Sequence, residues 1–463
     1  MNECILINKA GNLVPRSYLK HAENARVTRQ KQFRLLIEQR KLPEIGWDDA
    51  TIEEFVSFLA SLDSNNFPNK CGLGEREARI ACSLVAKRHY NFGHGMGRSG
   101  DLLEAQPKAA GSTLLAKLTN ALVLNLLKIS GIQNTRICFL VPMATAMTIN
   151  LCFLALKKQR PQAKFVLWSR IDQKACFKSI TTAGLTPLII EPLETDGGLV
   201  TNLLEFEGKL ASLKKEDVLC IYSTTSCFAP RNCDDIISLA NLAKSYDVPH
   251  VVNNAYGLQS SFLTEQIQQT SRKGRVDLFI QSTDKNLLVP IGGAIVAGFN
   301  KELVKDVAKT YAGRASSSQT LDVLMTLLSL GTNGYKELLK NRKEMFKYLR
   351  ENLQDLAKKH NETVLISKEN PISVAFTLET VRQNATLVGS MLYTRGISGA
   401  RAISTAEVKT IDSYHFKGWG SHCSTINTPY VTFAASLGVT KKEINTAIRK
   451  LDDCLNQIKN FTL

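Results

Sequence analysis

Seven short apolar runs, separated by stretches with helical spacing, organise the middle of the chain. Their apolar residues follow one another without the alternation of a strand that has one wet face, which indicates strands buried on both faces. Helices between such strands predict a mainly parallel sheet in a large α/β domain. The runs cover residues 137–141, 165–168, 188–190, 218–222, 250–252, 276–280 and 294–297.

Helical patterns flank this region on both sides. Thr51 and Glu54 form a capping-box pattern ahead of apolar residues at helical spacing. The basic stretch before Pro43 has only a thin apolar stripe, so we expect this helix to project towards another subunit or an anion. A helical pattern over residues 321–360 and an apolar run at 371–377 predict a smaller α+β domain. The predicted organisation is a helical N-terminal extension with a phosphate-binding loop (1–111), the large domain (112–318) and the small C-terminal domain (319–463).

The composition is that of an ordinary soluble globular protein, with 44% hydrophobic and 22% charged residues among 463. The first residues lack a basic start followed by an apolar run, so we expect no secretory signal. The uncharged stretch 137–156 approaches membrane-spanning length, but Pro142 and Asn150 split it into a strand, a turn and a helix. We therefore predict no membrane span.

Cysteine usage and charge bear on compartment and partners. The eleven cysteines are scattered and have no C-x-x-C spacing, which favours a reducing cytoplasm and argues against a metal site. Lysine and arginine exceed aspartate and glutamate by 58 to 42, a net charge of +16. This excess favours encounter with a polyanion, although many basic proteins bind none.

Lys285 is the strongest catalytic candidate. It follows the run 276–280, and a lysine at a strand end inside a core loses solvation, so its pKa falls and the neutral amine can form a Schiff base with an aldehyde cofactor. A surface lysine in a hairpin turn is the alternative. Upstream, the run 250–252 ends in Asn253 and Tyr256. This order is similar to that of pyridoxal 5′-phosphate (PLP) enzymes with the aspartate-aminotransferase fold, fold type I.

A glycine-rich loop precedes the first strand. Gly95, Gly97 and Gly100 spell G-x-G-x-x-G, but no apolar strand leads into them and no βαβ unit follows, so we reject a dinucleotide site. The glycines still let the backbone approach an anion, and Arg98 and Ser99 offer a guanidinium fork and a hydroxyl. The loop therefore predicts a phosphate site. A flexible loop with an incidental arginine is the alternative.

Six segments together resemble the O-phosphoseryl-tRNA(Sec) selenium transferase family, also called Sep-tRNA:Sec-tRNA synthases. The resemblance runs from about residue 12 to the C-terminus, with the motifs in the family's order. It implies a fold-type I PLP enzyme. The segments are GLGEREAR (72–79), HGMGRSGD (94–101), QPKAAGS (106–112), STTSCFAPR (223–231), NNAYG (253–257) and DKN (284–286).

The resemblance implies a cytoplasmic selenium transferase, assembled as a homotetramer through its N-terminal helix. Such an enzyme removes phosphate from O-phosphoserine on tRNA(Sec) and adds selenium from selenophosphate to the dehydroalanyl intermediate. Lys285 is then the Schiff-base lysine, and Glu75 a filter against free amino acids. The remaining candidates are Arg76, Thr145, Gln173 and Asn253 for the cofactor, Arg98, Ser99, Gln106 and Arg314 for the substrate phosphate, and Arg272 and Arg395 for tRNA.

Two cofactor candidates can also be argued from chemistry. Thr145 stands where a helix starts after the first strand, and free N–H groups there favour phosphate; a plain N-cap is the alternative. Asn253 stands where many fold-type I enzymes have an aspartate, whose charge keeps the pyridine nitrogen protonated. An uncharged amide predicts a weaker electron sink, which suits elimination better than transamination or racemisation.

Two other functions fit part of the pattern. A PLP-dependent decarboxylase or desulfurase that acts on a free amino acid could use Arg401 for the substrate carboxylate, but Glu75 would repel that group. A non-enzymatic tRNA-binding protein would have no need of Lys285.

Overall fold

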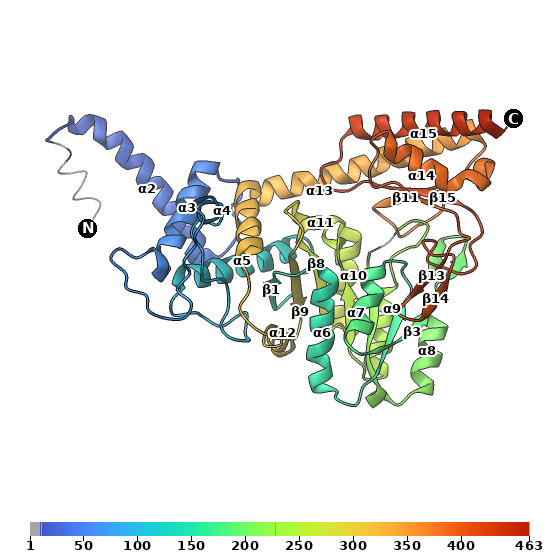
Figure 1. Cartoon of the computed structure of the whole chain (residues 1–463), viewed down its shortest axis with the longest axis horizontal. Helices are drawn as coiled ribbons and strands as arrows, with labels where there is room; N and C mark the ends of the chain where they lie inside the picture. Colours follow the sequence, from blue (N-terminus) through green and yellow to red (C-terminus); the bar gives the residue numbers. More distant parts are fainter. Residues whose placement is uncertain (1–9, 11, 227, 463) are drawn as a thin grey trace.

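The computed structural model describes residues 10, 12–226 and 228–462. The chain start, where we expect no secretory signal, and Cys227 in the STTSCFAPR segment lie outside these residues. Figure 1 shows a helical N-terminal part at one end of the molecule, a sheet covered by helices in the middle, and a smaller C-terminal part packed beside it.

A seven-stranded sheet forms the centre of the large domain. Its strands are β1 (Ile137–Val141), β2 (Phe165–Ser169), β3 (Thr186–Ile190), β6 (Val218–Thr224), β7 (His250–Asn253), β8 (Leu278–Ser282) and β9 (Ala294–Gly298). They lie in the order β1-β9-β8-β7-β6-β2-β3. The five strands from β8 to β3 pair in parallel, whereas β9 is antiparallel to both of its neighbours. Each of the seven predicted runs overlaps a strand, although residues 276–277 precede β8, and the prediction of a mainly parallel sheet is confirmed.

Helices cover both faces of this sheet, because successive side chains of a strand point to opposite faces. On β7, Val251 belongs to the hydrophobic cluster that includes residues of α6, α7 and α12, whereas Val252 belongs to the cluster that includes residues of α5, α9 and α10. The surrounding helices are α5 (Ala110–Ile129), α6 (Thr145–Gln159), α7 (Lys174–Thr182), α8 (Leu203–Ser212), α9 (Ile236–Ser245), α10 (Ser261–Lys273) and α12 (Lys301–Ala308). A β-hairpin of β4 (Leu193–Thr195) and β5 (Gly198–Val200) precedes α8.

The N-terminal part is less helical than we expected. Its helices are α2 (Arg16–Gln39), α3 (Asp49–Ser61), the 3-10 turn η1 (Ser64–Asn66) and α4 (Ser83–Arg88). Long stretches around α4 form loops without regular structure. The capping-box prediction is wrong, since Asp48 is the N-cap of α3 and its carboxylate accepts from the Thr51 amide at 2.9 Å.

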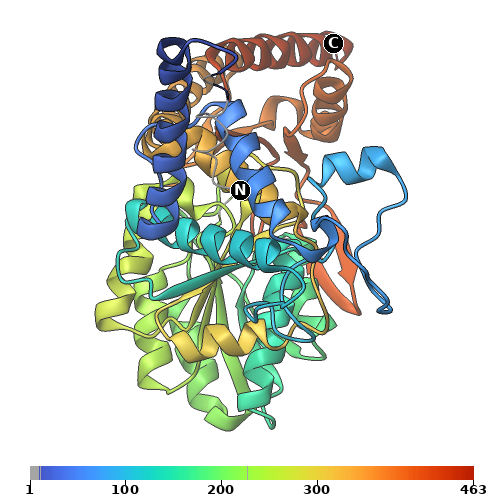
Figure 2. The same ribbon diagram turned by 90° about the vertical axis from the view of Figure 1, so that its left-hand side faces the viewer.

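The basic helix α2 lies at the edge of the molecule, as Figures 1 and 2 show from two directions. Its C-terminal half packs against the rest of the chain through Leu36 and through Phe33, whose ring lies 5.0 Å from that of Phe55. The rest of α2 is largely exposed, as expected of a helix with a thin apolar stripe.

The long helix α13 (Ser318–His360) joins the two domains. It bends at Gly331, whose φ of 59° and ψ of −172° are not helical. A Cβ there would lie 2.7 Å from the Gly46 amide nitrogen, so the bend depends on close approach to the segment before α3.

The small domain packs a sheet against helices. The antiparallel sheet has the order β10-β11-β15-β12, and β13 and β14 form a separate hairpin. The elements are β10 (Val364–Leu365), β11 (Ser373–Thr377), α14 (Ala385–Thr394), β12 (Arg401–Ile403), β13 (Val408–Ile411), β14 (Tyr414–Lys417), β15 (Tyr430–Ala434) and α15 (Lys441–Thr462). The domain boundaries given above stay a prediction.

Residues 137–156, which approach membrane-spanning length, are strand β1, a turn and part of α6, as predicted. Within the described residues one helix, α5, is long and apolar enough to cross a membrane, and 56% of its most apolar window is buried in the protein. It packs against α13, β1 and α3 as a core helix.

Candidate active site

A cavity of about 200 Å³ opens at the carboxyl ends of the parallel strands, where ligands bind in open α/β sheets. The strand β8 leads into the short helix α11 (Thr283–Leu287), which carries Lys285, and β7 ends at Asn253. Thr145 begins α6, and Gln173 directly precedes α7. These four predicted residues, from four different connections, line the same cavity.

Lys285 is held at the mouth of this cavity by polar neighbours. Its Nζ lies 3.1 Å from Asp284 Oδ2 and 3.2 Å from Ser282 Oγ, and its side chain is 41% exposed. The expectation that Lys285 lies inside a core is therefore wrong. Its amine is accessible from the cavity, and a carboxylate stands beside it.

Hydroxyl groups gather around the N-terminus of α6. Thr145 Oγ1 shares a hydrogen bond with Ser282 Oγ. Ser226 Oγ is buried and has no hydrogen-bond partner among the described residues. Thr145 itself is not the N-cap, because Ala144 holds that position without a side-chain cap. The hydroxyls and the free first-turn N–H groups together favour a phosphate or another anion.

The deep side of the cavity is uncharged. Asn253 Oδ1 accepts from the Ala255 amide at 3.1 Å, and its Nδ2 donates to Cys176 Sγ at 3.2 Å. Burial raises the pKa of the Cys176 thiol to about 11, so it is neutral at physiological pH. Among the described residues that line the cavity, Asp284 is the single acid.

An aromatic wall closes another side. Phe228 and Tyr256 line the cavity, with ring centroids 6.2 Å apart and planes at 79°. The sequence pattern did not single out Cys176, Ser226 or Phe228 as site residues. Phe228 and Ser226 lie within the STTSCFAPR segment, which was the one signal available; for Cys176 there was none.

The glycine-rich loop forms a second cluster with the segment around Arg314. Met96 and Ala315 exchange backbone hydrogen bonds of 2.8 and 3.2 Å, and the Gly100 amide donates to the Gly313 carbonyl at 3.3 Å. This pairing brings Arg98 and Arg314 onto adjoining segments. None of the predicted phosphate residues lines the Lys285 cavity.

The arginine side chains of this cluster, Arg98 and Arg314, already form contacts within the chain. Arg98 pairs with Glu104 at 3.3 Å, and Arg314 donates to the His94 carbonyl. Burial, reinforced by the neighbouring positive charge of Arg76, lowers the pKa of Arg314. Arg76 is exposed and close to Arg314, not in the cavity that holds Lys285.

The loops next to this cluster carry the other predicted residues. Glu75 and Ser99 are exposed, and Gln106 is partly buried. Glu77, which the sequence did not single out, is buried and pairs with Lys108 at 2.5 Å while accepting from the Gly74 amide at 3.0 Å. This ion pair fixes the loop that presents Glu75.

The two predicted tRNA contacts lie on other surfaces. Arg272 is exposed in the last turn of α10. Arg395, at the C-terminus of α14, is partly buried against α15, where its Nη1 donates to Cys454 Sγ at 2.9 Å. In the described part of the chain no three His, Cys, Asp or Glu side chains form a metal-binding group.

Comparisons with known proteins agree with one another. A family model described as O-phosphoseryl-tRNA(Sec) selenium transferase, SepSecS, matches residues 62–456. The O-phosphoseryl-tRNA(Sec) selenium transferase of Dictyostelium discoideum is 44% identical over 468 residues, which cover 96% of this chain and 98% of the relative. The crystal structure of an archaeal O-phosphoseryl-tRNA(Sec) selenium transferase aligns with a TM-score of 0.88 at 30% identity, over 95% of this chain and 98% of the other. A structure described as SPT with PLP shares the fold, with a TM-score of 0.55 at 12% identity, over 80% of this chain and 82% of the other.

Proposed function

Since this chain belongs to the O-phosphoseryl-tRNA(Sec) selenium transferase family, whose members are fold-type I PLP enzymes, we propose that it converts O-phosphoseryl-tRNA(Sec) to selenocysteinyl-tRNA(Sec). In this proposal the Cα proton and the Cβ–O bond are lost first, releasing phosphate and leaving dehydroalanyl-tRNA. The selenium of selenophosphate then bonds to Cβ, a proton returns to Cα, and hydrolysis of the Se–P bond releases a second phosphate.

The cavity residues fit PLP, which supplies an electron sink for the negative charge at Cα when it is bound. Lys285 would hold its aldehyde carbon. Thr145, Ser226 and the first turn of α6 would hold its phosphate. The buried Ser226 hydroxyl supports this fit because it lies in the cavity wall and has no hydrogen-bond partner among the residues that the structure describes. Gln173 and Asn253 would contact the ring.

Lys285 Nζ is also the proposed general base for the Cα proton. A base must reach the proton that it removes, and Lys285 is the lysine that lines the cavity. The Asp284 carboxylate, 3.1 Å away, stabilises the ammonium that forms when the proton arrives. The same ammonium can return the proton to Cα after selenium has added.

The substrate phosphate needs cationic partners, and we assign it to Arg98, Ser99, Gln106 and Arg314. Two guanidinium groups can neutralise a phosphate dianion, and each charge-assisted hydrogen bond contributes about 1.5–3 kcal/mol. Glu75 beside them would repel the free carboxylate of an amino acid that is not esterified to tRNA.

The arginine cluster and Lys285 must act on the same aminoacyl group, yet they line different surfaces of one chain. We infer that a homo-oligomer, a tetramer by family resemblance, brings the arginine cluster of one copy to the cavity of another. Arg76 would reach the cofactor phosphate in the same way. The exposed part of α2 is available for this assembly.

The tRNA partner accounts for the charge. A net charge of +16 raises the local concentration of a polyanion, and Arg272 and Arg395 are the proposed contacts. Cytoplasmic tRNA(Sec) is then the expected partner.

The observation that carries this proposal is the meeting of Lys285, Asn253, Thr145 and Gln173 in one cavity of a chain that aligns with a family member over 96% of its length. The test is turnover of phosphoseryl-tRNA(Sec) against free phosphoserine, each with selenophosphate. We expect selenocysteinyl-tRNA from the first and no product from the second. Equal use of free phosphoserine would overturn the assignment of a tRNA-bound substrate.

A further inference from the structure

The loop between β6 and α9, residues 225–235, contributes to the aromatic wall of the cavity and contacts the small domain. This β6–α9 loop carries Phe228, and small-domain groups hold it from several sides. Ser373 Oγ accepts from the Ala229 amide at 2.8 Å, and the Glu369 amide donates to Asn232 Oδ1 at 2.9 Å. The position of Phe228 therefore depends on the small domain as well as on the sheet.

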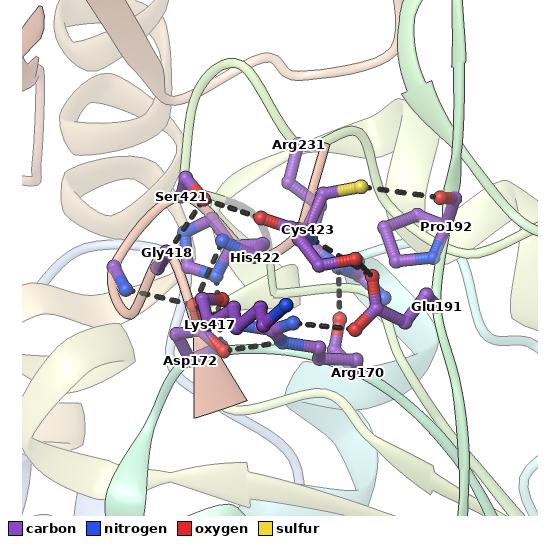
Figure 3. A network of polar contacts seen from close by, with 12 residues as sticks. Arg170, Asp172, Glu191, Pro192, Arg231, Lys417, Gly418, Ser421, His422 and Cys423 are labelled. Carbon is purple, nitrogen blue, oxygen red and sulfur yellow. Dashed lines mark hydrogen bonds and ion pairs between the residues drawn. The ribbon is translucent and has the colours of Figure 1, made fainter. Parts of the chain in front are cut away.

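A buried polar network fixes the segment after β14, residues 418–424, to the end of β2 (Figure 3). Asp172 Oδ2 accepts from the amides of Gly420 and His422, at 2.7 and 2.8 Å. The buried Arg170 donates to both oxygens of Asp172, to Glu191 at 2.6 Å and to the Lys417 carbonyl at 2.7 Å. The carboxylate and the guanidinium are thus both well satisfied, and their network joins the two domains.

The same network sets the chemical form of His422. The Asp172 amide donates to His422 Nδ1 at 2.8 Å, so Nδ1 must be unprotonated and the ring proton stays on Nε2. Burial, with the charges of Arg231, Arg401 and Arg170 adding to it, lowers the pKa of His422 well below its usual value. His422 is therefore a neutral ring with a fixed orientation.

The face of this ring lies on Phe228. The two ring centroids are 5.8 Å apart and the planes make an angle of 14°. The guanidinium carbon of Arg401, on β12, lies 5.8 Å from the same phenyl centroid. Two small-domain residues thus contact a large-domain ring that lines the cavity, and one of them is anchored by the network around Asp172.

We propose that His422 is a positioning residue for the cofactor cavity: locked in place by Asp172, it holds the Phe228 ring as a wall of the site and so couples the small domain to cofactor binding. This inference rests on the proposed placement of PLP in that cavity. It does not depend on tRNA or selenium chemistry, so it can be tested without turnover.

The test measures PLP binding to the full-length protein, with cofactor absorbance as the readout. His422 has a φ of 68°, which asparagine tolerates, and an asparagine carbonyl can still accept from the Asp172 amide. His422→Asn therefore removes the stacked ring while it keeps the anchor. We expect the PLP dissociation constant to rise about 3- to 10-fold, the effect of one aromatic pair.

A double-mutant cycle separates positioning from general support. If His422 acts through Phe228, the substitution His422→Asn should have no further effect on PLP affinity in a Phe228→Ala background. Ser424→Ala is the matched control, because Ser424 lies on the same segment but contacts Glu191, at 2.6 Å. It should leave PLP affinity unchanged.

Two results would overturn the inference. One is an unchanged PLP affinity in His422→Asn, and the other is an effect of His422→Asn that adds in full to that of Phe228→Ala. If His422→Asn does not fold, His422→Gln gives the same comparison with a longer acceptor. Failure of the proposed function would show elsewhere, as absent selenocysteinyl-tRNA from a protein that still binds PLP through Lys285.

Discussion

The Asn253 amide donates to the Cys176 thiol at 3.2 Å on the deep side of the cavity. The Ala255 amide fixes which end of the side chain is the oxygen, because it donates to Asn253 Oδ1. A flipped amide would place its NH₂ group against that backbone donor. Asn253 therefore meets a bound cofactor as a neutral amide of set orientation, beside a neutral thiol.

Replacing this amide with a carboxylate tests whether its neutrality matters. In Asn253→Asp we expect the pyridine nitrogen of bound PLP to become protonated, since a buried negative charge stabilises the pyridinium form. In the unaltered protein the nitrogen should be unprotonated. The ¹⁵N chemical shift of labelled PLP reports the difference, and Cys176→Ser, which keeps an acceptor for Nδ2, is the control. The same protonation state in both proteins would contradict the prediction.

Removal of the lysine tests the covalent attachment of the cofactor. We expect Lys285→Ala to fold, to lack the absorbance of lysine-bound PLP and to have no turnover. Its side chain is 41% exposed, so truncation leaves no buried cavity. Lys305→Ala, an exposed lysine paired with Glu302 at 2.8 Å, is the control for a lost surface charge. Selenocysteinyl-tRNA formation by Lys285→Ala would refute the assignment.

Much of this site could be predicted because the polar residues that line it follow the apolar runs of the strands in the sequence. The uninterrupted apolar runs located every strand of the central sheet, and parallel strands bring their carboxyl ends to one edge. Lys285, Asn253 and Thr145 follow such ends, so their meeting required no knowledge of the tertiary structure.

The remaining features depend on contacts between distant segments. Asp48 caps α3 in place of Thr51 because either residue type can cap, and the local pattern does not rank them. The exposure of Lys285 is set by how α11 sits against the cavity mouth. His422 contacts Phe228 only because the small domain folds back over the sheet, which neither segment specifies alone.

The arginine cluster is expected to serve the substrate and not the cofactor. Arg98→Ala should slow phosphate elimination from phosphoseryl-tRNA by about 10- to 150-fold, since loss of one charge-assisted contact removes about 1.5–3 kcal/mol. PLP absorbance should stay. Arg314→Ala should behave alike, although it also loses the contact with the His94 carbonyl.

Glu104→Gln is the matched control for this pair of variants. It releases Arg98 from its ion pair at 3.3 Å without removing the guanidinium, so elimination should persist. Loss of cofactor absorbance with retained turnover in either arginine variant would show that the cofactor and substrate phosphates are exchanged in our assignment.

Binding of tRNA should be separable from cofactor binding. Arg395→Ala should weaken tRNA affinity by about 1–3 kcal/mol, the range for one well-placed arginine contact to a base, and leave PLP absorbance unchanged. Affinity should fall as salt rises, because phosphate neutralisation releases counterions. Arg449→Ala, on the exposed side of α15, controls for charge alone.

A chain lacking residues 1–42 should lose its assembly. A truncated chain that stays oligomeric, with unchanged tRNA affinity at every salt concentration, would refute the role given to α2.

Folding stability should decline below pH 6.5 because two histidines are buried in neutral form. Burial lowers the pKa of His250 to about 4, and His422 shifts in the same direction. His250 Nε2 pairs with the Ser223 hydroxyl at 2.7 Å and Nδ1 with the Arg275 carbonyl at 3.2 Å. The charged groups near His250 are Asp234 and Asp277. Those around His422 are Asp172, Arg170, Arg231 and Arg401.

The direction of this pH dependence follows from the pH at which the folded chain and the unfolded chain each bind a proton on the histidines. Above pH 6.5 both histidines are neutral in the folded and unfolded chains, so their contribution is fully present. Below pH 6.5 the unfolded chain binds protons that the folded chain does not bind. Each histidine then lowers the free energy of unfolding by about 1.4 kcal/mol per pH unit until its folded pKa is reached.

Carboxylates add their own acid dependence, so the measurement compares variants. The quantity compared is the slope of the free energy of unfolding against pH, from urea titrations between pH 6.5 and 4.5. His250→Gln should reduce that slope by about 1.4 kcal/mol per unit, and His21→Gln, an exposed position on α2, should not change it. Equal slopes in the unaltered chain and His250→Gln would show that His250 is charged in the folded protein.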